Sequence, residues 1–268
     1  MKPLRIAFVG WGAIARACVA ALDELGANVE LVAIAVRRPD VVRPNLPTRP
    51  LRILTDPSEL AACGLDVVVE AAGRDAVGPW GFASLNAGLD FIVSSVSAFA
   101  DPVLLASMIK AAEQSGTSLR VQPGALAGID ALASARAMGI ETVEHRIVKP
   151  PGAWRGTPAQ EIIELDQIGD TTIIHQSNAT EAADRFPKNA NVAMTTALAG
   201  IGAERTQITM IADPNSTTNR HEIDAAGAFG QLSISIANNP LPDNPKTSAM
   251  AALNLARVLA NQTAAFVI

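Results

Sequence analysis

The chain begins by alternating short apolar runs with segments of helical spacing, and this alternation constrains the fold more than any other feature. Leu4–Val9 is an apolar run that ends in a glycine, and helix-like spacing follows from Ala13 to Gly26, a glycine suited to ending a helix. Val29–Ala35 is a second run, and its uninterrupted hydrophobicity is typical of a parallel strand covered on both faces. These residues predict a strand, a glycine turn, a helix and a second strand.

The same alternation continues to about residue 125. Asp101 and Pro102 are suited to the N-cap and first position of a further helix, and Gly116 to its end. The other predicted elements are strand 66–70, a helix from Gly73 to Gly88, strand 89–93 and strand 118–122. Strands that alternate with helices through short loops predict an α/β fold, with a Rossmann-type doubly wound parallel sheet over residues 1–125.

A second α/β domain, with a mixed or antiparallel sheet, is predicted at residues 126–246, because the sequence becomes β-rich after about residue 140. Its predicted elements are strand 142–149, an apolar strand that ends at His175, a helix that begins at Asn178, helix 191–199, strand 207–212 and a hairpin of 221–227 with 230–237. In the hairpin Leu232, Ile234 and Ile236 alternate with serines. We therefore expect the hairpin to have one buried apolar face and one solvent-exposed face. Such a sheet is suited to covering a cofactor or packing on another subunit. An apolar helix at 247–261 is expected to pack back onto the first domain.

Composition narrows the classes of partner. The net charge is −5 and no run of like charge follows the chain, so nucleic acid is not an expected partner. No apolar run approaches the roughly 18 residues that span a bilayer, so we expect no membrane contact and a cytoplasmic location. Cys18 and Cys63 lie in apolar segments, where we expect free buried thiols and no metal site.

The turn after the first strand has the pattern of a dinucleotide site. Gly10 allows a tight turn, Gly12 lets the backbone approach a pyrophosphate, and Ala15 is small enough for helix packing. A phosphate would then contact the free N–H groups at the start of the helix, where Ala13 and Ile14 lie. We expect these residues to bind NAD or NADP; the alternative is a purely structural turn.

The end of the second strand lacks the acidic residue that usually holds the ribose 2′-hydroxyl. Arg37 and Arg38 stand there instead. Because a guanidinium can pair with a 2′-phosphate, Arg37 predicts that NADP is accepted, alongside or instead of NAD. The alternative is that both arginines are solvated surface charges.

Three histidines are available for proton transfer near neutral pH. His145 lies between Val143 and Ile147 on one strand face, and His175 ends an apolar strand, so structural roles are expected for both. His221 follows a polar stretch and enters a strand, a position at a loop edge where catalytic groups tend to lie.

Several separate segments, taken together and in order, resemble the L-aspartate dehydrogenase family over essentially the whole chain. They include 149–151, 154–158, 186–193, 199–202, 212–214, 219–223 and 244–248, together with Gly124 and Ala125. The resemblance implies a Rossmann domain joined to an α/β domain that carries the substrate and forms a homodimer. It also implies oxidation of L-aspartate to iminoaspartate with NAD or NADP, and the imine either feeds pyridine nucleotide synthesis or hydrolyses to oxaloacetate and ammonia.

The same resemblance assigns roles to individual residues. The active-site histidine of the family corresponds to His221, and two cofactor contacts correspond to Ala125 and Asn191; a capping role is the alternative for Asn191. The chain departs from the family at Ala71, where cysteine is frequent, and at Arg74, where histidine is expected.

The residues that bind the substrate carboxylates stay open at this point. Arg155, Lys188, Arg220 and Lys246 lie in the matching segments, and the sequence does not rank them. Two other functions also stay open. One is a dehydrogenase or reductase of another small acid, such as homoserine or a dihydrodipicolinate-like compound, and the other is a dinucleotide-binding sensor without turnover.

Overall fold

The computed structural model describes residues 2–47, 50–187, 189–242 and 244–267, and the chain divides into two compact units. The first unit combines the chain up to Gln122 with the chain from Ala251 onward, and the second spans Pro123–Met250. The second unit is therefore inserted between two parts of the first.

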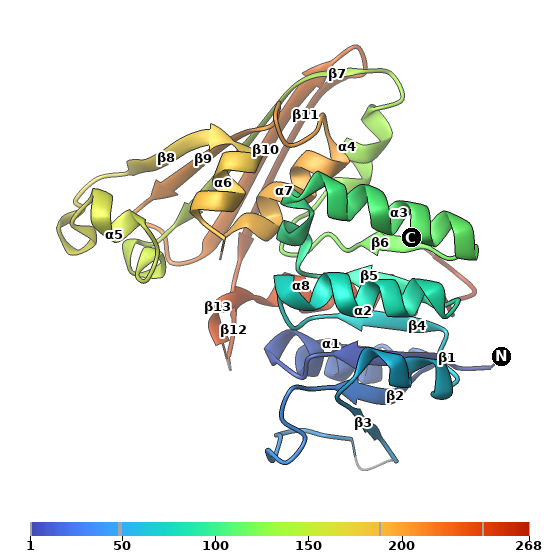
Figure 1. Ribbon diagram of the computed structural model, residues 1–268. Coiled ribbons are helices and arrows are strands. Elements are labelled where there is room, and N and C mark those ends of the chain that lie inside the picture. Colours follow the sequence, from blue (N-terminus) through green and yellow to red (C-terminus); the bar gives the residue numbers. More distant parts are fainter. Residues whose placement is uncertain (1, 48–49, 188, 243, 268) are drawn as a thin grey trace. The chain divides into compact units, whose positions relative to one another are not determined.

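The first unit is built on a six-stranded parallel sheet (Figure 1). Its strands are β1 (Leu4–Val9), β2 (Val29–Ala35), β3 (Arg52–Leu54), β4 (Val67–Glu70), β5 (Asp90–Val93) and β6 (Leu119–Val121). The order across the sheet is β3-β2-β1-β4-β5-β6, which reverses direction at β1. This order is that of a doubly wound nucleotide-binding sheet, so the predicted fold class is confirmed.

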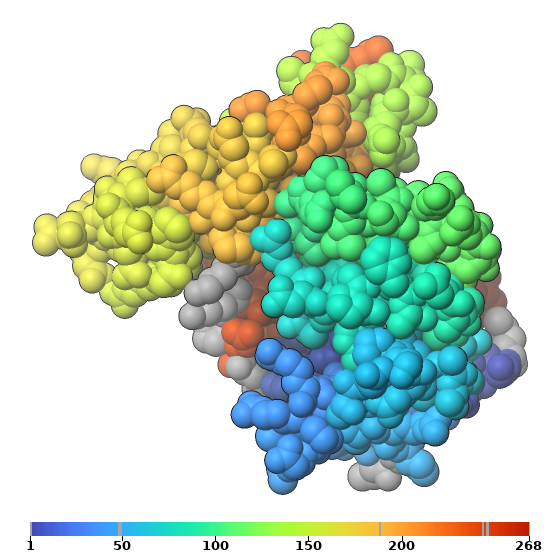
Figure 2. Space-filling view, viewed as in Figure 1, coloured from blue at the N-terminus to red at the C-terminus, as the bar shows by residue number. Residues whose placement is uncertain are grey.

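Helices cover both faces of this sheet. On one face α1 (Ala13–Glu24) and α8 (Ala249–Ala260) pack against strand residues such as Ile6 and Phe8. On the other, α2 (Arg74–Asn86) and α3 (Pro102–Ser115) pack side by side, and their atoms form one continuous surface in Figure 2. Covering on both faces explains why the strands are uninterrupted apolar runs.

The caps of α3 agree with the sequence-based prediction. The Asp101 carboxylate accepts hydrogen bonds from the N–H groups of Val103 and Leu104, at 2.9 and 3.2 Å. Gly116 ends the helix in a left-handed conformation with φ of 68°. By contrast, the edge strand β3 was not predicted, because it has three residues, two of them exposed, and directly follows a proline-rich stretch.

The second unit contains a five-stranded mixed sheet in the order β11-β10-β7-β9-β8. Its strands are β7 (Ile140–Lys149), β8 (Thr172–Asn178), β9 (Gln207–Ala212), β10 (Asn219–Gly227) and β11 (Gly230–Asn238). Its helices are α4 (Ile129–Ala135), α5 (Ala159–Ile162), α6 (Ala179–Arg185) and α7 (Ala190–Ala199), and a short pair, β12 (Pro240–Leu241) and β13 (Asn244–Ser248), follows the sheet. Residues of α4 and α7 pack on one face of the large sheet. The predicted mixed sheet and its hairpin are confirmed.

Several predicted boundaries in this part of the chain are wrong, and two of them show the reason. The strand that was expected to end at His175 continues to Asn178, because its last three residues pair with β9. The helix expected at 247–261 begins at Ala249 and ends at Ala260, because the residues just before it pair with β12 as part of β13. In both cases strand pairing with a neighbour overrides the local pattern.

Cys18 and Cys63 are both free and buried. None of the helices in the described ranges has the length and apolar character that a bilayer crossing demands. Over the same ranges, no group of three or more histidine, cysteine or acidic side chains is arranged to hold a metal ion.

Candidate functional site

Gly10 closes the turn between β1 and α1. Its φ of +91° suits glycine, and a Cβ there would lie 2.9 Å from the carbonyl oxygen of Ala71 and from the Cα of Ala72. Its N–H donates to the carbonyl of Ala35 at 2.8 Å. The backbone of Gly10 therefore lies against the backbone of Ala71 and Ala72, and a side chain on Gly10 would force the ends of β1 and β4 apart.

Gly12 is the N-cap of α1 and faces open space. No side chain caps the helix, and a Cβ on Gly12 would meet nothing within 4 Å. Ala13 and Ile14 are the first two helical residues, and the side chain of Ile14 packs against the core. Free N–H groups at an uncapped helix start next to an open surface suit a phosphate, so the residues present fit the pyrophosphate of a dinucleotide.

A hollow of about 1230 Å³ adjoins this turn, at the carboxyl ends of β1, β2 and β4. Arg37 and Arg38 are exposed at its edge, and the half-buried Arg43 and Arg74 also line it. Trp11 also lines the hollow; its indole N–H donates to the carbonyl of Pro44 at 3.1 Å. Binding at the carboxyl ends of strands where the order reverses is the general rule for such sheets.

Glu70, which the sequence analysis did not single out, organises the loop between β4 and α2. Its fully buried carboxylate accepts hydrogen bonds from the N–H groups of Ala72 and Gly73, at 2.7 and 2.8 Å. It also accepts from the N–H and hydroxyl of Ser95, each at 2.9 Å. An acidic residue at the end of an apolar strand was the available signal, since a buried carboxylate needs several donors.

In the second unit, three buried side chains form a hydrogen-bonded chain. The Thr196 hydroxyl lies 3.0 Å from Nδ1 of His145, and Nε2 of His145 lies 3.2 Å from Nδ1 of His221. The strand register explains the contact, because His221 pairs with Ile147 and therefore shares a sheet face with His145. His221 is the third residue of β10, just after the loop that follows β9, as the sequence predicts, and its side chain is buried, with 3% exposed.

His145 and His221, the two histidines of this hydrogen-bonded group, are both neutral at pH 7. Burial, and to a lesser degree the charge of Arg146, lowers the pKa of His145 to about 3. The pKa of His221 also lies well below 6.5, because of burial and then of the charges of His145 and Lys149. If the Thr196 hydroxyl donates to His145, Nε2 of His145 donates to Nδ1 of His221, and His221 carries its own proton on Nε2. If the hydrogen bonds run in the opposite direction, Nδ1 of His221 is the donor and its Nε2 is an acceptor.

His175 does not take part in the hydrogen bonds that join Thr196, His145 and His221. It is half-buried on β8 and its ring lies 5.1 Å from that of Phe186. The expected structural role suits this packing.

Lys149 ends β7 and was missed as a functional candidate. Its ammonium donates to the side-chain oxygen of Asn189 at 2.5 Å and lies 5.4 Å from the ring centre of Trp154. Burial lowers the pKa of Lys149 to about 8. The available signal was a lysine at the carboxyl end of an apolar strand, followed by two prolines.

The candidate cofactor contacts of the second unit lie in different settings. Ala125 is buried in the loop before α4, and its carbonyl accepts from Asn238 at 2.9 Å. Asn191 is exposed and is the second residue of α7. The N-cap of that helix is Asn189, so a capping role for Asn191 is wrong.

Two of the four basic candidates are already paired with carboxylates. The exposed Arg155 binds Asp166, and Arg220 binds Glu222 at 2.8 Å with Asp213 at 3.8 Å. Lys188 lies outside the described residues. Lys246 belongs to β13.

Comparison with known proteins finds matching families for both parts of the chain. Residues 130–262 match the family model "Aspartate dehydrogenase, C-terminal", and residues 10–122 match "Homoserine dehydrogenase, NAD binding domain". A curated L-aspartate dehydrogenase of Brucella anthropi is 49% identical, with 98% of each chain covered. One of Pseudomonas aeruginosa is 38% identical over 96% of this chain and 97% of its own. The crystal structure of aspartate dehydrogenase from Thermotoga maritima is 25% identical, covers 99% of both chains and has a TM-score of 0.76. The chain belongs to the aspartate dehydrogenase family.

Proposed function

We propose that this protein oxidises L-aspartate to iminoaspartate with NAD or NADP as the oxidant. The observation that carries the proposal is the 49% identity, over nearly the full length of both chains, to a curated L-aspartate dehydrogenase. The dinucleotide turn at Gly10 and Gly12 and the buried His221 are compatible with it. The imine then hydrolyses to oxaloacetate and ammonia or is used in pyridine nucleotide synthesis, and the reverse reductive amination is also available.

His221 is the proposed acid–base group. The nicotinamide, when bound, accepts the hydride from the α-carbon of aspartate, and this transfer requires a neutral amine. His221 is held neutral by its buried surroundings and can take the ammonium proton when its Nε2 is the acceptor. The His145 and Thr196 contacts orient the ring and determine which nitrogen is free.

The proposed cofactor contacts follow from the first unit. Gly10 and Gly12, with the backbone of Ala13 and Ile14, bind the pyrophosphate, and Arg37 approaches the adenosine ribose. Ala125 and Asn191 remain the candidate contacts in the second unit.

One assay tests the proposed function and distinguishes it from a dehydrogenase of another small acid and from a cofactor-binding sensor. The purified protein is incubated at alkaline pH with NAD or NADP and a panel of amino and hydroxy acids that includes L-aspartate and homoserine, and formation of reduced nicotinamide is followed by absorbance. We expect turnover with L-aspartate. Turnover with another acid alone would indicate a different dehydrogenase, and cofactor binding without any turnover would indicate a sensor.

Arg37→Asp is expected to weaken the use of NADP. The substitution removes a cation from the hollow and places an anion where the 2′-phosphate would bind. We expect the Michaelis constant for NADP to rise by roughly tenfold or more, about 1.4 kcal/mol, while that for NAD changes little or falls. Steady-state kinetics with both cofactors measures this change.

The control for this substitution is Arg136→Asp, which makes the same charge change at an exposed residue of the second unit. It should leave both Michaelis constants near wild type. Unchanged NADP kinetics in Arg37→Asp would remove Arg37 from the cofactor site.

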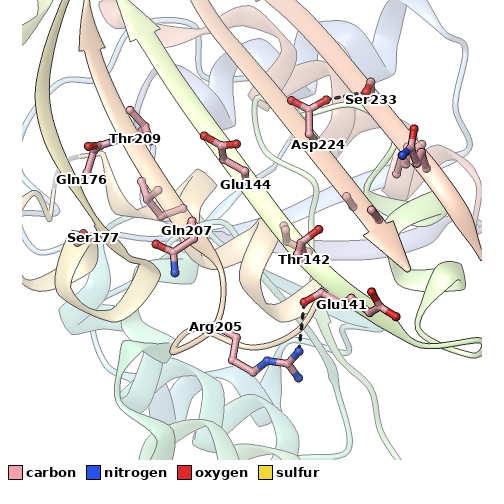
Figure 3. A pocket seen from close by; sticks show the side chains of 16 residues that line it. Glu141, Thr142, Glu144, Gln176, Ser177, Arg205, Gln207, Thr209, Asp224 and Ser233 are labelled. Carbon is pink, nitrogen blue, oxygen red and sulfur yellow. Dashed lines mark hydrogen bonds between the residues drawn. The ribbon is translucent and has the colours of Figure 1, made fainter. Parts of the chain in front are cut away.

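The mixed sheet supports a further proposal, that the protein forms a homodimer. The face opposite α4 and α7 carries a polar hollow of about 920 Å³, and Figure 3 shows Glu144, Asp224 and Ser233 lining it from neighbouring strands. Arg146 on this open face bonds Glu222 at 2.9 Å and Asp224 at 2.5 Å. A broad, ordered polar sheet face of this kind suits a second copy of the chain.

Ser235→Arg tests this association, because Ser235 is exposed on the same face of β11. Light scattering of the wild type is expected to give the mass of two chains, and the bulky charge should shift the mass toward one chain. Ser134→Arg on the exposed side of α4 is the matched control and should keep the wild-type mass. A wild-type mass of one chain would contradict the homodimer.

A cytoplasmic location remains part of the proposal. It agrees with a substrate and a cofactor that are both small soluble molecules. Cell fractionation with an antibody against the chain tests it, and recovery with the membrane pellet would contradict it.

A further inference from the structure

We propose that Lys149 and Asn189 form the subsite that binds one carboxylate of the dicarboxylate substrate beside His221. The inference rests on the proposed function for the identity of the substrate. It assigns a binding role to two residues that were not among the four basic candidates.

Lys149 is a cation without an anionic partner. Its three N–H groups include one that donates to the Asn189 oxygen, and no carboxylate of the described residues lies within the 4 Å of an ion pair. A half-buried ammonium in this state has lost part of its hydration without gaining a counter-ion. A bound carboxylate would supply that counter-ion.

Asn189 adds donors that are also unused. Its side chain is 8% exposed, its oxygen is taken by Lys149, and its buried Nδ2 has no hydrogen-bond partner among the described residues. The orientation of the amide is fixed, because its nitrogen cannot accept a hydrogen bond from an ammonium. A buried amide donor without an acceptor is rare and points to a ligand that supplies one.

The two side chains together present donors only. Asn189 is moreover the N-cap of α7, and no side chain caps that helix, so its first N–H groups favour negative charge at the same end. Strand register places Lys149 near the proposed acid–base group: His221 pairs with Ile147, and Lys149, two residues further along β7, lies on the same sheet face. A carboxylate, which only accepts hydrogen bonds, is complementary to this set.

Two of the competing cations are paired with carboxylates elsewhere. Arg155 is exposed and bonded to Asp166, and Arg220 lies between Glu222 and Asp213. Of these three cations, Lys149 is the one without a carboxylate partner among the described residues. This is why the structure favours it over Arg155 and Arg220.

Asn189→Asp is the sharpest test. The new carboxylate keeps an acceptor for Lys149 and nearly the same shape, so the fold should be retained. It replaces the two amide donors with a negative charge, which occupies Lys149 and repels a substrate carboxylate. We expect the Michaelis constant for L-aspartate to rise about 100-fold, while the dissociation constant for NADH stays within threefold.

A direct binding measurement uses succinate as the probe. Calorimetric titration of the NADH-loaded protein with succinate should show binding in the wild type and at least 30-fold weaker binding in Asn189→Asp and in Lys149→Met. Asn178→Asp is the matched control, because Asn178 caps α6 and aspartate is an equally good N-cap. It should bind succinate as the wild type does.

The outcomes separate this inference from the proposed function. Wild-type affinity for succinate in both site variants, or no succinate binding to the wild type, would overturn the carboxylate subsite. Succinate binding that depends on Lys149 and Asn189, in a protein that fails to oxidise L-aspartate, would support the subsite and reject the proposed substrate.

Discussion

Replacing His221 by alanine is expected to lower the turnover number for L-aspartate by two to four orders of magnitude. This is about the effect of losing one positioned acid–base group. The imidazole is buried, and its contact with His145 holds it in one place, so bulk water cannot take over its role efficiently. Steady-state kinetics at saturating cofactor and substrate measures the change.

The control is His175→Ala, which removes the half-buried histidine that packs on Phe186. Its turnover should stay within a few-fold of wild type. The dissociation constant for NADH should be unchanged in both variants, because neither histidine is among the proposed cofactor contacts. Turnover near wild type in His221→Ala would remove His221 from the mechanism.

Replacing Lys149 by methionine is expected to stabilise the fold near neutral pH while it weakens substrate binding. The pKa of Lys149 falls from 10.5 to about 8 on folding, so the unfolded chain binds a proton more tightly than the folded one. Below pH 8 this difference destabilises the folded state by about 3 kcal/mol. Loss of the hydrogen bond to Asn189 offsets about 1 kcal/mol, which leaves a net gain of about 2 kcal/mol.

The stability gain of Lys149→Met over the wild type is expected to decrease as the pH rises. As the pH rises from 8 to 10.5, the unfolded lysine also loses its proton, so the advantage of Lys149→Met shrinks and is absent above 10.5. Urea unfolding of both proteins at pH 7 and pH 10.5 measures the difference. Lys110→Met, at an exposed position on α3, is the control and should change stability little at either pH. An advantage that grows with pH would contradict the assignment.

Sequence signals located the elements of the first unit well, because those signals are local. Leu4–Val9 and Val29–Ala35 are strands with the predicted bounds, and Asp101 and Gly116 cap α3 as expected. Each of these depends on apolar periodicity or on a cap within a few residues. The strand β3 lacks any such signal.

The contacts of the second unit were not predictable in the same way. The chain from Thr196 through His145 to His221 joins three elements, and the contact of Lys149 with Asn189 joins residues 40 positions apart. Such pairs depend on strand register and on how α7 packs on the sheet, which no short window of sequence contains. A lysine and an asparagine are unremarkable in the sequence, and they become a candidate site only when their unused donors are counted.

The helix α8 has a consequence for how the chain folds during synthesis. The residues Ala252, Leu255, Ala256 and Leu259 are fully buried in the core of the first unit. The ribosome makes this helix after the whole of the second unit, so the sheet that is made first waits for about half of the chain before the part of its face beside α1 that α8 occupies is covered. The inserted unit can complete its own core in that interval, and a nascent chain therefore holds a finished second unit while part of an apolar sheet face of the first unit still depends on chaperones or on the last helix for cover.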